Sequence, residues 1–274
     1  MPLADGFAWF KACAPVQAFE PRLTAELASR WPDLLPRVLA FDEGHRRLLL
    51  ADAGTPIGEH GNPPETWLRI LPRYAELQRG ETSHAQDHLA HGVSDLRVAG
   101  LAARYEELLR DDLPLEAAEI ERLRLLAPWF AAACEELAAH GIADTVQHDD
   151  LHMKHVYARG DELRILDWGD ASISHPFASL VVTFRFLEER NGLPPDDPWF
   201  GRLRDAYLEP WGRGLDETFR LAIRVGAFAH AIAWLPHREH LTREALRTFD
   251  ESFAIVLRRA LAQASDEFSR PRRS

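Results

Sequence analysis

The sequence predicts an α+β protein with two unequal lobes, in which a small β-rich lobe precedes a larger and mostly helical one. Short apolar runs separated by turn residues fill residues 1–54, whereas stretches with helical periodicity dominate residues 55–274. A single island of loop and short strands interrupts the helical part from Thr145 onward. We therefore expect a domain boundary close to residue 54.

The small lobe reads as strand, helix, strand, strand. Hairpin-turn residues at 4–6 precede an apolar run at 7–10. Leucines and a tryptophan recur at helical spacing and predict a helix from residue 20 to residue 31. Two further apolar runs, at 37–41 and 46–51, flank a glycine-containing turn and predict a second hairpin.

The large lobe is predicted to be helical on both sides of the island. Helical periodicity covers residues 63–79, 98–110, 115–140 and 177–190 and most of the chain from there to residue 268. We expect kinks at Pro72 and Pro128. Within the island, a turn at 159–161 separates two short apolar runs, which predicts a hairpin.

Composition excludes several classes of protein. The formal net charge of −11 argues against a nucleic-acid-binding protein, which usually carries a basic face, and fits a cationic small-molecule partner. No apolar run approaches the length of a membrane span, and the first residues have no apolar signal core. Because two cysteines are too few for a disulfide framework, we expect a cytoplasmic protein.

The island contains the candidate catalytic and metal-binding residues. It contains the segments HDDLHMKHVY, residues 148–157, and ILDWGD, residues 165–170, joined by the hairpin. Metal-dependent phosphoryl transfer needs an acid at the attacking hydroxyl, acids that hold Mg²⁺, and a cation on the phosphate oxygens. Asp150 and Asp167 could lie close together at the open end of the hairpin, and Lys11 could supply the cation. Lys11 and Lys154 are the only lysines among 32 basic residues, so a lysine within an apolar strand is conspicuous.

The chain resembles the aminoglycoside phosphotransferase and choline kinase-like family, whose members have a protein-kinase-like fold. Members carry a loop of the form H-x-D-x-x-x-x-N, often HGDLHPGN, followed by D-W-x-D or D-F-x. This sequence has His148, Asp150 and His152 in register with the loop, and then DWGD at 167–170. The segments WFKA, FEPRLTAEL and LLLADAG resemble the lysine strand, the glutamate-bearing helix and the hinge strand of the family.

The resemblance implies a role for each matching residue of the loop. Asp150 would orient or deprotonate the acceptor hydroxyl, and Asp167 would bind Mg²⁺ on the phosphates. His148 would pack and orient the loop. His152 is as well explained as a histidine that satisfies the loop as by a phosphate contact. For Asp170 we expect a turn or capping acid rather than a metal ligand.

The resemblance also implies a nucleotide site in the small lobe. Lys11 would contact the α- and β-phosphates and would pair with Glu20. We prefer Glu20 to Glu26, because Glu20 shares one helix stripe with the apolar positions. The backbone of Leu50, Ala51 and Asp52 would face the adenine edge.

Two departures from the family pattern stand out. His155 occupies the position of the asparagine that is the second metal ligand, and imidazole suits Mn²⁺ better than it suits Mg²⁺. Only ten residues precede Lys11, and no glycine-rich loop is among them, so we expect a shortened small lobe. A kinase fold that binds nucleotide or a partner without turnover is therefore a second interpretation.

A third interpretation uses the same residues for other chemistry. His148, His152 and His155 with Asp149 and Asp150 form a His/Asp cluster, as in metal-dependent phosphohydrolases. That interpretation leaves the lysine strand and the hairpin before Asp167 unexplained. We therefore expect a phosphotransferase that uses ATP and Mg²⁺, or Mn²⁺, to phosphorylate a hydroxyl of a small molecule such as an aminoglycoside or amino alcohol. The sequence does not determine the acceptor or the oligomeric state.

Overall fold

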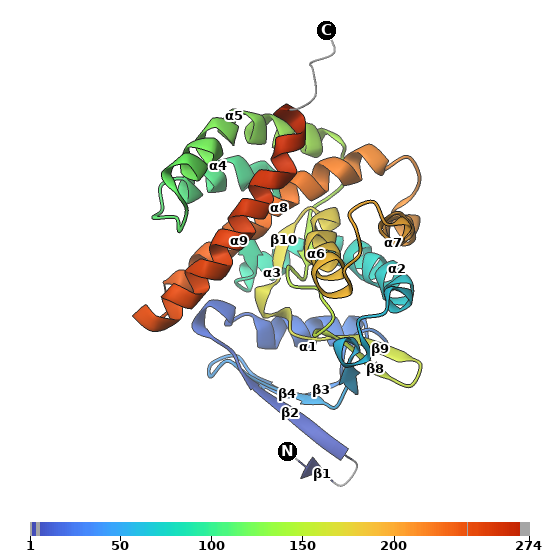
Figure 1. The fold of residues 1–274 in the computed structure, drawn as a ribbon. Helices are drawn as coiled ribbons and strands as arrows, with labels where there is room; N and C mark the ends of the chain where they lie inside the picture. Colours follow the sequence, from blue (N-terminus) through green and yellow to red (C-terminus); the bar gives the residue numbers. More distant parts are fainter. Residues whose placement is uncertain (1, 4–5, 240, 269–274) are drawn as a thin grey trace.

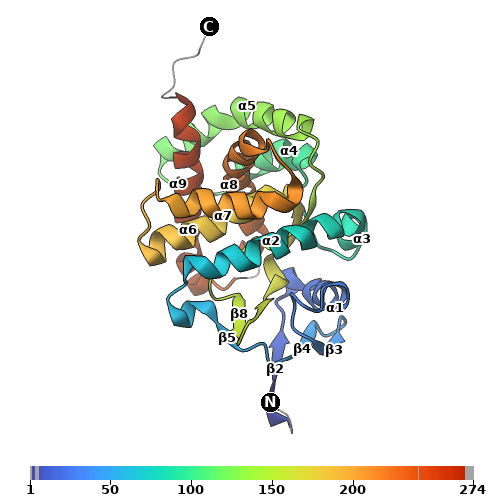
Figure 2. The ribbon, with the colours of Figure 1, turned by 90° about the vertical axis from the view of Figure 1, so that its right-hand side faces the viewer.

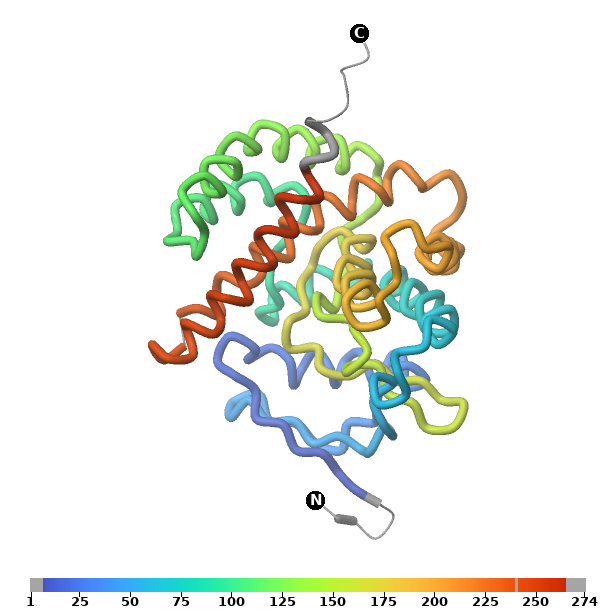
Figure 3. The backbone as a smooth tube through the Cα atoms, in the orientation of Figure 1, coloured from blue at the N-terminus to red at the C-terminus, as the bar shows by residue number. Residues whose placement is uncertain are grey.

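The computed structural model describes residues 2–3, 6–239 and 241–268, and it confirms the α+β class. Figure 1 shows a small lobe with a β-sheet below a larger lobe of helices. The segment that contains the island, yellow-green to yellow in Figure 3, runs between the N-terminal sheet and the upper helices. The chemistry-bearing segments therefore lie where the two lobes meet.

The small lobe is a four-stranded antiparallel sheet with one helix packed against it. In the order β1-β2-β4-β3, its strands are Pro2–Leu3, Gly6–Ala12, Arg47–Ala51 and Val38–Asp42. β1 and β2 pair antiparallel, with Leu3 opposite Gly6; residues 4 and 5 of the expected hairpin turn lie outside the described residues. Lys11 on β2 pairs with Leu48 on β4, so the lysine sits in the body of the sheet.

Helix α1, Glu20–Arg30, forms where the apolar periodicity predicts it. Pro21 stands in its first turn, where the missing amide proton is not needed. Glu20, Leu23 and Leu27 are buried along one stripe, whereas Glu26 lies off it and accepts a hydrogen bond from Arg22 Nε at 3.0 Å. The spacing of the apolar residues therefore turns Glu20 toward the interior.

The large lobe contains the remaining helices. They are α2 Pro64–Glu81, α3 Ala85–Ala90, α4 Val98–Leu108, α5 Ala117–Ala139, α6 Leu180–Asn191, α7 Pro198–Leu208, α8 Asp216–Arg238 and α9 Arg243–Phe268. Figure 2 shows α7 lying along α2, and α8 packs against α9. Pro72 lies inside α2 and Pro128 inside α5, so neither proline ends its helix. No helix among the described residues has the length and apolar character needed to cross a membrane.

Two small three-stranded sheets hold the island. One has the order β6-β10-β7, formed by Ser94–Asp95, Ser172–Ser174 and Thr145–Gln147. The other has the order β5-β8-β9, formed by Thr55–Pro56, Val156–Arg159 and Glu162–Ile165. The loop 148–155 leaves the first sheet and enters the second, and the turn 166–171 returns to the first. Both chemistry-bearing segments are therefore anchored at both ends.

The link between the lobes depends on a glycine. Gly54 has a φ of 98°, and a Cβ at this position would lie 2.1 Å from the carbonyl oxygen of Ala158. Directly after it, Thr55 pairs with Ala158 on β8. A side chain at Gly54 would therefore push the linker away from the hairpin that carries the island.

Candidate active site

Lys11, Glu20 and Asp167 come together at the junction of the lobes. Lys11 Nζ donates a hydrogen bond to Glu20 Oε1 at 2.6 Å and another to Asp167 Oδ1. Glu20 is almost fully buried, and its Oε2 has no hydrogen-bond partner among the described residues. Burial alone would lower the pKa of Lys11, but the two carboxylates outweigh it and raise that pKa well above its usual range. Lys11 is therefore a fixed positive charge.

The loop that carries Asp150 is held by His148. His148 Nδ1 accepts a hydrogen bond from the Asp150 backbone N–H at 3.3 Å, so Nε2 carries the proton and donates to the Leu166 carbonyl at 2.8 Å. Burial lowers the pKa of His148 to about 4, which keeps the ring neutral. His148 thus ties the loop to the turn that precedes Asp167, a placement that fits the orienting role expected for it.

Asp150 is flanked by two histidines. His152 Nδ1 accepts from the Lys154 backbone N–H at 3.1 Å, so its Nε2 proton points to Asp150 Oδ2, 3.3 Å away. His155 Nδ1 lies 3.5 Å from the same oxygen. Burial would raise the pKa of Asp150, but these two rings lower it far below its usual range. Asp150 is therefore ionised at neutral pH.

His155 fits the position of a metal ligand beside Asp167. Its Nδ1 lies 2.9 Å from the Asp150 carbonyl oxygen, which can only accept, so the proton is on Nδ1. In the neutral ring, Nε2 then presents a lone pair to Asp167 Oδ2 at 3.3 Å. Either a proton on Nε2 or a cation held between the two atoms relieves the repulsion of two acceptors at this distance. A backbone carbonyl on the other ring nitrogen is the usual partner of a metal-binding histidine.

A cavity of about 460 Å³ opens beside these residues. Its charged and polar lining residues include Lys11, Glu20, His155 and Asp167. Its other walls are largely apolar and come from both lobes: Trp9, Phe10, Pro36, Leu48, Leu50, Ala53, Tyr157 and Leu166 contribute to them. A cavity with largely apolar walls, one lysine and several carboxylates suits a nucleotide, whose base is apolar and whose phosphates bind cations.

The three expected hinge residues are placed differently from one another. Leu50 lines the cavity, but Ala51 and Asp52 are not among its lining residues. The Ala51 N–H donates to the Arg37 carbonyl at 2.9 Å, and the Asp52 N–H donates to the Phe7 carbonyl at 3.2 Å. These two amides are thus already used within the sheet, whereas Ala53 and Gly54, which follow them, line the cavity.

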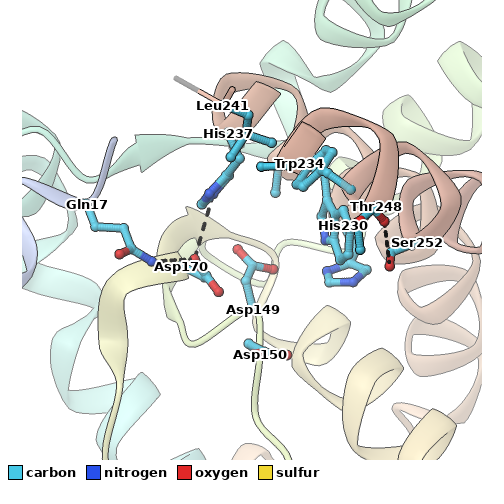
Figure 4. A pocket seen from close by; sticks show the side chains of 13 residues that line it. Gln17, Asp149, Asp150, Asp170, His230, Trp234, His237, Leu241, Thr248 and Ser252 are labelled. Carbon is cyan, nitrogen blue, oxygen red and sulfur yellow. Dashed lines mark hydrogen bonds and ion pairs between the residues drawn. The ribbon is translucent and has the colours of Figure 1, made fainter. Parts of the chain in front are cut away.

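Asp150 lines a second cavity, of about 660 Å³ (Figure 4). Asp149, Asp150 and Asp170 face it from the island, and α8 and α9 supply the opposite wall. Asp170 accepts a hydrogen bond from Gln17 Nε2 at 2.9 Å. Asp150 thus faces one cavity, while Asp167 and His155, which contact each other, face the other.

The same contacts weigh against the phosphohydrolase interpretation. Both ring nitrogens of His148 are used in hydrogen bonds inside the protein, and Asp149 faces the second cavity. Asp150, His152 and His155 do place ligand atoms within 4.8 Å of one another. However, the His152 proton is already directed at Asp150, so this ring is poorly arranged as a metal ligand.

Residues outside the predicted motifs support the loop from behind. Tyr74 on α2 accepts a hydrogen bond from the His148 backbone N–H at 2.9 Å, and Gln78 Nε2 donates to the Val146 carbonyl at 3.1 Å. Gly169 was also missed: a Cβ there would lie 2.7 Å from Gln17 and 2.8 Å from Glu20. Two sequence features could have identified these residues: polar side chains on the apolar stripe of α2 and a glycine inside the DWGD turn.

This arrangement, with a small sheet and α1 over a helical lobe and a loop and acid turn between them, is the protein-kinase-like fold. Solved structures of small-molecule kinases share it. A choline/ethanolamine kinase family protein from Mesorhizobium loti matches with a TM-score of 0.60 and 15% identity, over 93% of this chain and 86% of that one. The macrolide 2'-phosphotransferase MphH from Brachybacterium faecium matches with a TM-score of 0.59 and 18% identity, over 93% and 86%.

A third similar structure is the GDP complex of aminoglycoside 2'-phosphotransferase-IIIa. It has a TM-score of 0.56 and 16% identity, over 90% of this chain and 83% of that one. No protein-family model matches the sequence, and a search of curated proteins finds no match either. At these identities the similarity establishes the fold alone.

Proposed function

We propose that this protein is a phosphotransferase that moves the γ-phosphoryl group of ATP to a hydroxyl of a small molecule. One observation carries the proposal: Lys11, Asp167 and His155 line one cavity, Asp150 lines the other, and His155 contacts both aspartates. A phosphate donor in the first cavity and a hydroxyl in the second would meet at this loop. That is the geometry that phosphoryl transfer requires.

Lys11 supplies the fixed charge at the phosphate end. Glu20 holds the ammonium group, and Asp167 shares it, so Lys11 needs no rearrangement to meet anionic oxygens. Asp167 and His155 would hold the divalent cation, Mg²⁺ or Mn²⁺, which when bound neutralises and aligns the phosphate oxygens. The mixed oxygen and nitrogen ligands favour Mn²⁺ more than an all-oxygen site would.

Asp150 acts on the acceptor. Because its pKa is far below the usual range, its carboxylate is ionised and accepts a hydrogen bond from the attacking hydroxyl. A weak base of this kind orients the hydroxyl and takes up its proton as the bond to phosphorus forms. His152 and His155 hold the carboxylate in place while it does so.

The similar structures support the general class. The choline/ethanolamine kinase family protein and the macrolide phosphotransferase are small-molecule kinases by name, and the aminoglycoside phosphotransferase is described with bound nucleotide. Cys13 and Cys134 are both free and buried, which suits the cytoplasmic location that we propose.

Calorimetric titration of ATP into the purified protein, first with Mg²⁺ and then with Mn²⁺, tests the nucleotide site. We expect metal-dependent binding that is lost in Asp167→Asn. Asp150→Ala should keep that binding but abolish transfer to acceptors that the parent phosphorylates. Absence of ATP binding with either metal would overturn the proposal. Binding without transfer to any acceptor in a broad screen of hydroxyl compounds would instead indicate a nucleotide-binding protein without turnover.

A further inference from the structure

A third cavity, of about 100 Å³, lies between α6, α8 and α9. Its walls are apolar except for five polar or charged side chains, which are those of Arg185, Glu188, His230, Arg259 and Gln263. His230 also lines the second cavity, where Figure 4 shows its ring, so the two cavities are neighbours. A group bound in the third cavity would therefore lie beside the cavity that Asp150 lines, and none of the five residues lines the nucleotide cavity.

The two arginines of this cavity differ in their partners. Arg259 Nη1 lies 3.9 Å from Glu188 Oε2, and Arg259 Nη2 donates a hydrogen bond to Glu189 Oε1. The charge of Arg259 is thus met by two carboxylates. Arg185 donates no hydrogen bond to a carboxylate of the described residues, and its buried Nε has no hydrogen-bond partner among them. The cavity therefore contains one guanidinium group without a counter-ion in contact.

The surroundings of Arg185 do not compensate its charge. The side chain is partly buried, and its Cζ lies 5.0 Å from the centre of the Phe186 ring. Burial lowers the pKa of Arg185, and the carboxylates of Glu189 and Asp150 act in the opposite direction only through space, without reversing that shift. A guanidinium group remains charged even so. A buried, charged donor without an acceptor is costly, so the arrangement points to an anion.

His230 is an independent sign of a ligand at the same place. It is 7% exposed, and neither of its ring nitrogens has a hydrogen-bond partner in the part of the chain that the structure describes. Burial lowers the pKa of His230 to about 4, so the neutral ring carries one N–H donor and one lone pair. Buried polar groups are almost always hydrogen-bonded. Two side chains from different helices, Arg185 and His230, thus have unused donors at one cavity.

We propose that the third cavity binds a small oxyanion, a carboxylate or a phosphate, which accepts hydrogen bonds from Arg185 Nε and from the ring N–H of His230. The side-chain amide of Gln263 can donate a further hydrogen bond. The anion either is free in solution or is an acidic group of the acceptor, because His230 lines the second cavity as well. The inference goes beyond the proposed function and does not depend on it, since none of these residues takes part in the proposed transfer.

Other ligands fit the third cavity less well. A cation would meet Arg185 without a free carboxylate, because Glu188 already lies beside Arg259. A purely apolar group would leave Arg185 Nε and both nitrogens of His230 without partners. Water could satisfy those hydrogen bonds but would bring no charge to balance Arg185. A water-filled cavity therefore predicts that no anion binds, which calorimetry can measure.

Titration with inorganic phosphate tests the anion site directly. We expect the parent protein to bind phosphate in calorimetry and Arg185→Met to weaken that binding at least about tenfold, as for a lost charge-assisted hydrogen bond. Methionine keeps an unbranched stem beside Phe186, and urea unfolding of the variant checks that it folds. Arg190→Met removes the same charge from the exposed end of α6 and should leave phosphate binding unchanged. His230→Phe keeps an aromatic ring but no donor, and it should weaken the binding about tenfold.

Two compounds of the same shape distinguish the sources of the anion. 4-(Hydroxymethyl)benzoate and 4-(hydroxymethyl)benzamide share a hydroxyl group and an aromatic frame, and only the benzoate is charged. If the acceptor supplies the anion, the parent should prefer the benzoate at least about tenfold, and Arg185→Met should abolish the preference. If phosphate binds at Arg185 but the parent does not prefer the benzoate, the site takes a free anion.

Three results would overturn the inference. The first is a parent protein that binds no phosphate at millimolar concentration and does not prefer the benzoate. The second is anion binding that Arg185→Met leaves unchanged or that Arg190→Met weakens equally. The third is phosphate binding that is lost in Lys11→Met and kept in Arg185→Met, because it would place the phosphate in the nucleotide cavity. ATP titration of the same samples reports on the proposed function separately.

Discussion

Replacing Asp149 by asparagine should change how the stability of the folded chain depends on pH. Burial raises the pKa of this carboxyl from 3.8 to about 8, and the neighbouring carboxylates of Asp170 and Asp150 add to the effect. Because the folded-state pKa lies above the unfolded value, the folded chain keeps a proton that the unfolded chain releases. The resulting stabilisation is complete below the unfolded pKa and is lost as the pH rises toward the folded one.

The size of the effect follows from the width of that window. Between the two pKa values, each pH unit removes about 1.4 kcal/mol of stability relative to a chain with no such group. From about pH 5 to about pH 7, the parent should therefore lose about 3 kcal/mol more than Asp149→Asn does. Asparagine keeps an Oδ1 that can accept the hydrogen bond from Gln147, so the variant isolates the titration.

Urea unfolding followed by tryptophan fluorescence, at several pH values and without nucleotide or metal, measures this difference. The buried histidines His148, His175 and His230 also titrate below neutral pH, but they are common to both proteins and cancel in the comparison. Asp161→Asn, on the exposed turn of the β8–β9 hairpin, controls for the loss of an aspartate elsewhere in the chain. Parallel stability curves for parent and Asp149→Asn would show that Asp149 is ionised in the folded protein and would refute the reasoning.

Three further substitutions test other contacts. Lys11→Met should weaken ATP binding about tenfold or more in calorimetry, because it removes the fixed charge beside Asp167. An unchanged affinity would show that Lys11 does not contact the nucleotide. His155→Asn should raise the affinity for Mg²⁺ relative to Mn²⁺ in ATP titrations, since it replaces a nitrogen ligand by an oxygen ligand. If the ratio of the two metal affinities stays constant, the histidine is not a metal ligand. Glu81→Gln should lower the free energy of unfolding, measured in urea, by about 3 kcal/mol, because the buried Glu81 accepts two hydrogen bonds from Arg30 at 2.7 Å. A loss under about 1 kcal/mol would mean that the Arg30–Glu81 pair contributes as little as an ion pair on the surface.

The parts of the site that local sequence patterns specify could be predicted. The stripe of Glu20, Leu23 and Leu27 follows from helical periodicity alone and turns the correct carboxylate toward Lys11. The loop and the DWGD turn are joined by a hairpin whose apolar runs are visible in the sequence. Because a hairpin returns the chain to its starting point, it brings His155 and Asp167 together.

The parts that depend on how distant helices cross could not be predicted. The second cavity is walled by α8 and α9, and Trp234 and His230 follow no motif that separates them from core residues. β6, β7 and β10 have two or three residues each, too few to show the period of a strand. The hinge was expected at residues 50–52, but strand register engages Ala51 and Asp52 in the sheet, and register is not visible in a single strand.

Backbone strain in the island gives a physical reason to regard Asp149 and Asp167 as functional. Both have positive φ values, 59° and 67°, and they are two of the four such non-glycine residues in the described part of the chain. The left-handed conformation costs an ordinary residue about 1 kcal/mol or more, and glycine would avoid that cost. Glycine is also the residue in the HGDLHPGN pattern at the place of Asp149. Backbone stability alone would therefore favour glycine at this position.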